Sequence, residues 1–220
     1  MAHEARSVTF YFDPISPYVW LCAARAIERI EAAGAQVRLE PVLFAAMLNA
    51  HGNVGPAEIA AKRAYTFRDV MRQAALAGLP FEGPPGHPFN PLQALRMCTV
   101  LVGERERRRF ALALFAACWE RGEDISDEAT LVRIAGECDL DGAALLAASR
   151  QAEVKQRLAA ATERAIADGV FGVPTFRLDG ELFWGGDRIG TLLWRLEGKG
   201  IDEGKLARFL AKPPLAERKR

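Results

Sequence analysis

The fold is decided at residues 8–18, VTFYFDPISPY, where a strand gives way to a helix. The run Val8–Phe12 is β-branched and aromatic, which favours a strand, and an Asp-Pro pair ends it. Apolar residues then recur at helical spacing from Val19 until Gly34, where the glycine ends the helix. The stretch therefore predicts a strand followed at once by a helix.

A serine stands at this junction. Ser16 is predicted as the helix N-cap and Pro17 as the first helical residue, because proline has no N–H to lose there and its φ is already helical. A hydroxyl is thus expected where backbone N–H groups and the positive end of the helix dipole converge. A plain helix cap is the alternative, although Val19 offers no side chain to complete a capping box.

The length and charge of the chain limit the kinds of protein and partner that can be expected. The 220 residues are enough to bury a core without metal or disulfides. The 29 basic and 28 acidic side chains nearly cancel, which excludes global attraction to nucleic acid or an anionic membrane. Small molecules or further copies of the chain are the expected partners.

The cysteines and the apolar runs predict a compartment. Four isolated cysteines without a C-x-x-C pair are expected to be buried thiols in a reducing cytosol: Cys22, Cys98, Cys118 and Cys138. The N-terminus has no apolar signal core, and no apolar run approaches the roughly 20 residues that span a bilayer. The protein is therefore expected in the cytoplasm.

Two further features predict no special chemistry. The three histidines lack ligand-like spacing, so no metal site is expected: His3, His51 and His87. The basic run Arg105–Arg109, broken by Glu106, is most simply a solvated helix face.

Taken in order, the chain is helical in its middle and β-like at both ends. Val37–Val42 predicts a second strand, parallel to the first. Residues 44–169 predict only helices. Thr175–Leu178 and Glu181–Trp184 then flank Asp-Gly, a strong hairpin signal, and a last helix runs through Leu196 with Asp187 as its cap.

This order predicts an α/β fold, a thioredoxin-like domain of βαβ and ββα halves interrupted by a large all-helical insertion. The expected divisions are 7–43 with 170–197 for the discontinuous thioredoxin-like domain, 44–169 for the insertion and 198–220 for a charged tail.

Three motifs carry a resemblance to a known family: FDPISPY at 12–18, GVPT at 172–175 and FWGGDR at 183–188. Together they resemble the 2-hydroxychromene-2-carboxylate isomerases, glutathione-dependent enzymes of aromatic-ring degradation related to kappa-class glutathione transferases. The resemblance spans roughly residues 8–196. It extends to the DsbA-type disulfide oxidoreductases, whose redox cysteines this chain lacks.

The resemblance implies roles around glutathione. The Ser16 hydroxyl would donate to the glutathione sulfur and lower its thiol pKa. Val173, before a cis Pro174, would pair its backbone with the cysteinyl unit. The γ-glutamyl end would be held by the run Trp184, Gly185, Gly186 and Asp187. The alternative to these binding roles is purely structural: Val173-Pro174 would only mark the start of a strand, and residues 184–187 would only form a glycine-rich turn.

The helical insertion is expected to supply the pocket for an aromatic carboxylate. By the same resemblance, Asn53 approaches glutathione and substrate, and the other residues expected to face substrate are Lys62, Tyr65, Phe89 and Asn90. For each of these, a solvated face or ordinary packing is the alternative interpretation.

The implied activity interconverts 2-hydroxychromene-2-carboxylate and trans-o-hydroxybenzylidenepyruvate, with glutathione as a recycled cofactor and a homodimer as the assembly. A kappa-type transferase or peroxidase and a non-catalytic glutathione-binding module stay open. Disulfide exchange is disfavoured, because Ser16 and Cys22 make no redox pair.

Overall fold

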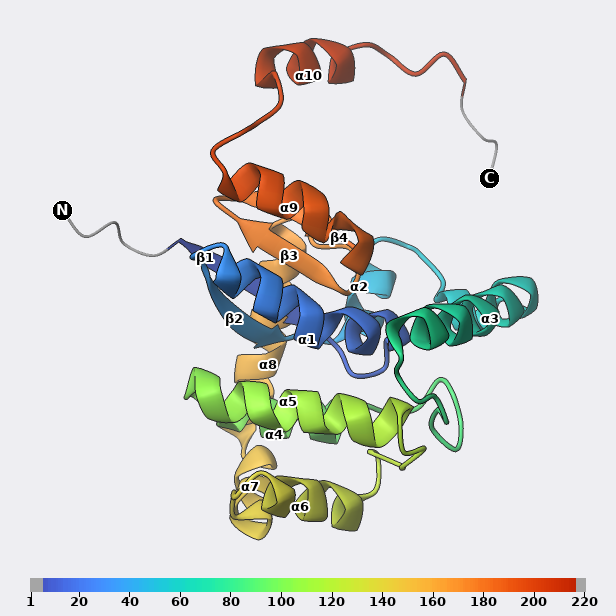
Figure 1. Ribbon diagram of the computed structural model, residues 1–220, viewed down its shortest axis with the longest axis vertical. Coiled ribbons are helices and arrows are strands. Elements are labelled where there is room, and N and C mark those ends of the chain that lie inside the picture. Colours follow the sequence, from blue (N-terminus) through green and yellow to red (C-terminus); the bar gives the residue numbers. More distant parts are fainter. Residues whose placement is uncertain (1–5, 217–220) are drawn as a thin grey trace, which may run out of the picture.

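The computed structural model describes residues 6–216, in which a four-stranded sheet lies above a block of helices (Figure 1). The strands are β1 (Ser7–Phe12), β2 (Gln36–Pro41), β3 (Thr175–Leu178) and β4 (Glu181–Trp184), in the order β2-β1-β3-β4. β1 pairs parallel with β2 and antiparallel with β3, and β3 pairs antiparallel with β4. The predicted fold class is confirmed.

Helices cover both faces of the sheet. α1 (Pro17–Ala32) and α9 (Ile189–Leu196) lie in front of the strands in Figure 1, and α8 (Ala152–Ala167) lies behind them. Between β2 and α8 the chain forms only helices: α2 (Phe44–Ala50), the 3₁₀ turn η1 (Pro56–Glu58), α3 (Ala60–Ala77), α4 (Leu92–Val100), α5 (Glu104–Trp119), α6 (Glu128–Glu137) and α7 (Gly142–Ser149).

The ends of two helices decide where functional groups lie. Ser16 is the N-cap of α1 and Pro17 its first residue, as predicted. The predicted cap at the last helix is wrong, because Asp187 lies inside the 3₁₀ turn η2 (Gly186–Arg188) and α9 begins only at Ile189. The carboxylate of Asp187 therefore does not cap α9.

One hydrophobic core joins the sheet to the helical block. Phe10 of β1 stacks on Phe176 of β3, with ring centroids 4.6 Å apart. Phe12, two residues on, meets Phe115 of α5 edge to face at 5.5 Å. The last residue of β1, immediately before the turn that carries Ser16, is thus anchored in the helical block.

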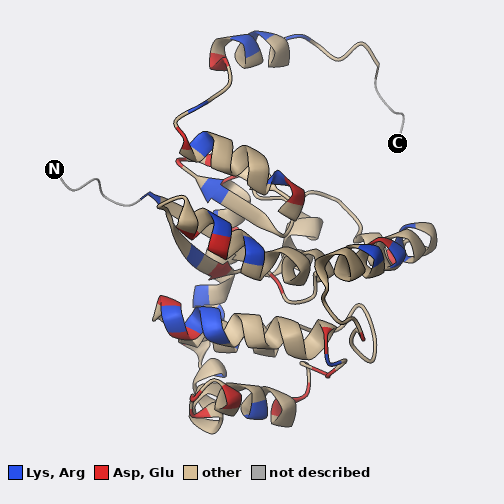
Figure 2. Ribbon diagram, viewed as in Figure 1, with Lys and Arg blue, Asp and Glu red and all other residues tan. Residues whose placement is uncertain are grey.

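Charged side chains of both signs lie along α1 and α3 and over the beginning of α5 (Figure 2). The predicted solvated face at Arg105–Arg109 is wrong for Arg107, whose side chain is only 11% exposed. Its guanidinium donates to the carbonyl oxygens of Leu39 at 2.9 Å and Leu101 at 2.8 Å. Arg107 therefore ties α5 to β2 and to the end of α4.

Beyond α9 the chain extends away from the sheet and the helices packed on it (Figure 1). α10 (Glu203–Leu210) has every residue exposed and stands apart from α9 in Figure 1. His3 and the last four residues of the predicted tail lie outside the described residues. Over residues 6–216, no helix is both long and apolar enough to cross a membrane.

Candidate active site

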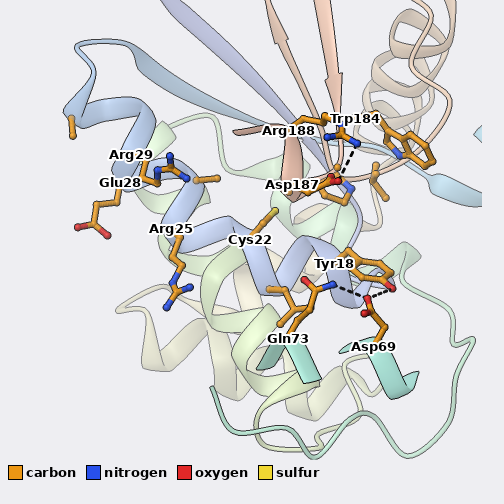
Figure 3. A pocket seen from close by; sticks show the side chains of 17 residues that line it. Tyr18, Cys22, Arg25, Glu28, Arg29, Asp69, Gln73, Trp184, Asp187 and Arg188 are labelled. Atoms are coloured by element: carbon orange, nitrogen blue, oxygen red, sulfur yellow. Dashed lines mark hydrogen bonds and ion pairs between the residues drawn. The ribbon is translucent and has the colours of Figure 1, made fainter. Parts of the chain in front are cut away.

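A groove of about 970 Å³ runs along α1, opposite the loop that joins β4 to α9 (Figure 3). Tyr18 and Cys22 line it from α1, and Val173 and Pro174 line it from the segment just before β3. The turn from Trp184 to Arg188 forms the facing wall. The predicted residues Val173, Pro174, Trp184, Gly185, Gly186 and Asp187 are therefore brought together on one groove.

Ser16 is buried, only 9% exposed, and is not among the residues that line this groove; it adjoins the groove through Val173, which does line it. Its side chain makes no cap hydrogen bond; instead Oγ lies 3.5 Å from the carbonyl oxygen of Val173, 157 residues away. Hydroxyl hydrogen bonds usually measure about 2.7–2.8 Å, so this contact is long. The hydroxyl can therefore turn to a better acceptor at the groove without losing a structural bond.

The turn that carries Ser16 rests on a buried carboxyl. Asp13 is fully buried, and its two oxygens accept from the backbone N–H groups of Ile15 and Phe44, each at 3.0 Å. Burial raises the pKa of Asp13 to about 7, because it opposes the charged form more than the two backbone hydrogen bonds favour it. Asp13 thus links the turn to the start of α2.

The Val173-Pro174 peptide bond is cis, as the resemblance implied. Val173 lies outside the sheet ladder, since β3 begins at Thr175. The next carbonyl, of Pro174, accepts from Gly185 N at 2.9 Å and so fastens the turn to the start of β3. The segment whose Val173 carbonyl lies beside the Ser16 hydroxyl is thus bonded to the turn at Gly185.

Glycines allow the backbone of the turn to come close to α1. Gly185 has φ +103°, a region that other residues rarely adopt. A Cβ on Gly186 would lie 2.5 Å from the Cβ of Cys22. The narrow approach between the turn and α1 therefore depends on glycine at 186.

Cys22 departs from its predicted burial. Cys98, Cys118 and Cys138 are buried as expected, whereas Cys22 is partly exposed on the groove wall. Its surroundings on α1 nevertheless raise the pKa of the thiol to about 12 through desolvation. A thiol with such a pKa is protonated at neutral pH and is a poor nucleophile.

The structure adds a polar cluster that sequence reasoning missed. Tyr18 donates its hydroxyl to Asp69 Oδ2 at 3.0 Å, and the Gln73 amide donates to the same oxygen at 2.7 Å (Figure 3). Burial, with help from Asp69, raises the pKa of Tyr18. The i,i+4 spacing of Asp69 and Gln73 was the available signal, but only the packing of α3 against α1 connects them to Tyr18.

The residues predicted to face substrate are not among those that line the groove. Asn53 and Lys62 are exposed, and Tyr65 is 64% exposed on α3. Phe89 packs against the core, and Asn90 accepts from Leu92 N at 3.0 Å at the start of α4. Their roles toward cofactor and substrate stay predictions.

Comparison with known proteins places this geometry in context. The family model described as DSBA-like thioredoxin domain matches residues 7–197. The 2-hydroxychromene-2-carboxylate isomerase of Sphingobium xenophagum is 28% identical over 191 residues, which cover 85% of this chain and 96% of that protein. Glutathione S-transferase kappa 1 of Rattus norvegicus is 25% identical over 218 residues, covering 90% and 94%. A solved 2-hydroxychromene-2-carboxylate isomerase superimposes with a TM-score of 0.79 at 27% identity, covering 93% of this chain and 98% of that one.

Proposed function

Since the chain belongs to the family of DSBA-like thioredoxin domains, we propose that it is a glutathione-dependent isomerase that interconverts 2-hydroxychromene-2-carboxylate and trans-o-hydroxybenzylidenepyruvate. The observation that carries the proposal is the Ser16 hydroxyl at the start of α1, 3.5 Å from the carbonyl oxygen of Val173, a residue that lines the groove. A hydroxyl at this place can bind a sulfur atom but cannot form a disulfide with it.

The groove fits a γ-glutamyl tripeptide. Its volume of about 970 Å³ exceeds the space that a tripeptide needs, and charged side chains line it both from α1 and from the facing turn, among them Arg25 and Asp187. Asp187 is exposed there, beside Arg188 at 3.2 Å. Gly186 lets this turn approach Cys22 of α1 closely, so that the turn and α1 form the two walls of one groove.

Different residues of the chain would bind different parts of glutathione. Ser16 Oγ would donate to the sulfur, and the N-terminus of α1 would favour its negative charge. The backbone of Val173 would pair with the cysteinyl unit as an added strand pairs with a sheet edge. Asp187 would bind the ammonium group of the γ-glutamyl end. Glutathione, when bound, would supply the thiol that adds to the substrate and leaves again.

A kappa-type transferase or peroxidase is the second candidate, and the similarity to the rat kappa transferase favours it. The same Ser16 and groove would bind glutathione in both cases. The two candidates differ in the fate of the thiol, which returns to solution in the isomerase and stays on the product in the transferase.

The proposal is tested by following the isomerisation of 2-hydroxychromene-2-carboxylate by absorbance, with and without glutathione. We expect turnover that requires glutathione but does not consume it. Turnover that ignores glutathione would contradict the mechanism. A stable conjugate with a model electrophile would favour the transferase, and binding without any turnover would favour a non-catalytic module.

Gly186→Ala should weaken glutathione binding about 10- to 100-fold, the scale of a 1–3 kcal/mol overpacking cost. Its Cβ would meet Cys22 Cβ at 2.5 Å and push the turn that carries Asp187 away from α1. Titration calorimetry measures the dissociation constant. Gly190→Ala is the control, because a Cβ there meets nothing within 4 Å. Equal affinity of both variants would mean that the turn does not bind the ligand.

A further inference from the structure

The turn before Ser16 is held by side chains from the helical insertion. Besides the Asp13 carboxyl, the indole of Trp119 in α5 donates to the carbonyl oxygen of Pro14 at 3.0 Å. The next carbonyl oxygen, of Ile15, lies 3.0 Å from Nε2 of His87. Two successive carbonyls thus find their partners on elements about 70 and 100 residues further along the chain.

The tautomer of His87 follows from this contact. A carbonyl oxygen only accepts hydrogen bonds, so Nε2 must carry the proton. Nδ1 is buried and has no hydrogen-bond partner among residues 6–216. Burial lowers the pKa of His87 more than the hydrogen bond with Ile15 raises it, and Arg63 lowers it a little further, so the ring is neutral at neutral pH with its one proton directed at Ile15.

Aromatic rings fix the orientation of the imidazole. Phe67 of α3 meets it edge to face at 5.1 Å between centroids, and Trp119 lies at 5.7 Å. Phe89, two residues on, lies at 6.1 Å. With the ring held on three sides, the direction of the Nε2–H bond is set by packing rather than by solvent.

From these contacts we propose that His87 is a positioning residue for Ser16: its Nε2–H holds the Ile15 carbonyl and so fixes where the Ser16 hydroxyl meets the thiol. The inference rests on the proposed function for the identity of that thiol. Because Ile15 directly precedes Ser16, a carbonyl that swings away rotates the peptide plane and moves the hydroxyl. A small displacement of a positioned group is enough to lower a rate strongly.

His87→Phe and His87→Gln separate this role from packing. Phenylalanine fills the aromatic cluster without a donor, whereas glutamine keeps an N–H that can reach the carbonyl. We expect His87→Phe to lower kcat about tenfold and to raise the pKa of the bound thiol, measured from the ultraviolet absorbance of its ionised form against pH. The KM for glutathione should change much less, and His87→Gln should recover most of the loss.

His51→Phe is the matched control, since it makes the same substitution at an exposed histidine at the end of α2. It should retain the wild-type thiol pKa. Unaltered kcat and thiol pKa in His87→Phe, or equal losses in the phenylalanine and glutamine variants, would overturn the inference.

A measurement without glutathione keeps the inference separate from the proposed function. Nitrogen NMR of the free protein should find His87 neutral and protonated on Nε2, and His87→Phe should shift the Ile15 carbonyl signal. A ring protonated on Nδ1 would overturn the inference. Failure of wild type to bind glutathione would instead overturn the proposed function.

Discussion

Ser16→Ala should lower the glutathione-dependent rate about 10- to 100-fold, because a hydrogen bond to a charged group is worth about 1.5–3 kcal/mol. The same loss should raise the pKa of the bound thiol by about one to two units, since one unit corresponds to 1.36 kcal/mol. Stopped-flow absorbance gives the rate, and the ultraviolet absorbance of the ionised thiol against pH gives the pKa.

The stability of Ser16→Ala should stay close to wild type. Loss of an N-cap side chain commonly costs about 1 kcal/mol, but Ser16 makes no cap bond to lose. Ser16→Thr is the matched control, because it keeps a hydroxyl at the same Cβ. Full activity of Ser16→Ala, or a loss of activity that parallels a loss of folding, would contradict a role for the hydroxyl in binding sulfur.

Asp13→Asn should change how stability depends on pH. The pKa of Asp13 rises from 3.8 to about 7 on folding, so protonation favours the folded state. Below pH 3.8 the carboxyl is protonated in both states. As pH rises toward 7, the Asp13 carboxyl ionises in the unfolded chain but stays protonated in the folded protein. The free energy of unfolding of wild type should therefore fall by up to about 4 kcal/mol relative to that of Asp13→Asn. Above that pH the difference should level off.

Urea unfolding of both proteins from about pH 2 to about pH 8 measures this difference. Asp127→Asn is a control of opposite sign, because the Asp127 carboxylate caps α6 at the surface and accepts from Thr130 N, which lowers its pKa. Its contribution should be present above the unfolded pKa and lost as pH falls. Parallel curves for wild type and Asp13→Asn would mean that Asp13 ionises normally in the folded protein.

Individual strands, helix starts and turns were predictable because interactions between residues close in sequence determine them. The β-branched run before an Asp-Pro pair gave β1, and a serine followed by proline gave the start of α1. The Asp179-Gly180 pair gave the hairpin, since both residues adopt positive φ there. The predicted cap at Asp187 failed because a 3₁₀ turn intervenes, and nothing in the local pattern distinguishes that turn from a helix start.

The site was predictable only where a motif already joined its residues. Val173 and the run 184–187 came from the resemblance and line the groove together. Asp69 and His87 were not identified as site residues, because their importance comes from contacts with Tyr18 and Ile15 across 51 and 72 residues of sequence. Arg107 was misjudged for the same reason, since a basic run does not reveal which of its members the neighbouring strand will bury.

By itself, the sequence determined a strand-helix junction with a hydroxyl at the helix start, an insertion made of helices and a closing hairpin, because periodicity, capping and turn chemistry act over a few residues. The contacts of Ser16 with Val173, of Gly186 with Cys22 and of His87 with Ile15 arise from tertiary packing. These contacts depend on how the sheet and the insertion pack together, and so do the pKa values of Asp13 and His87, because desolvation is a property of the assembled core.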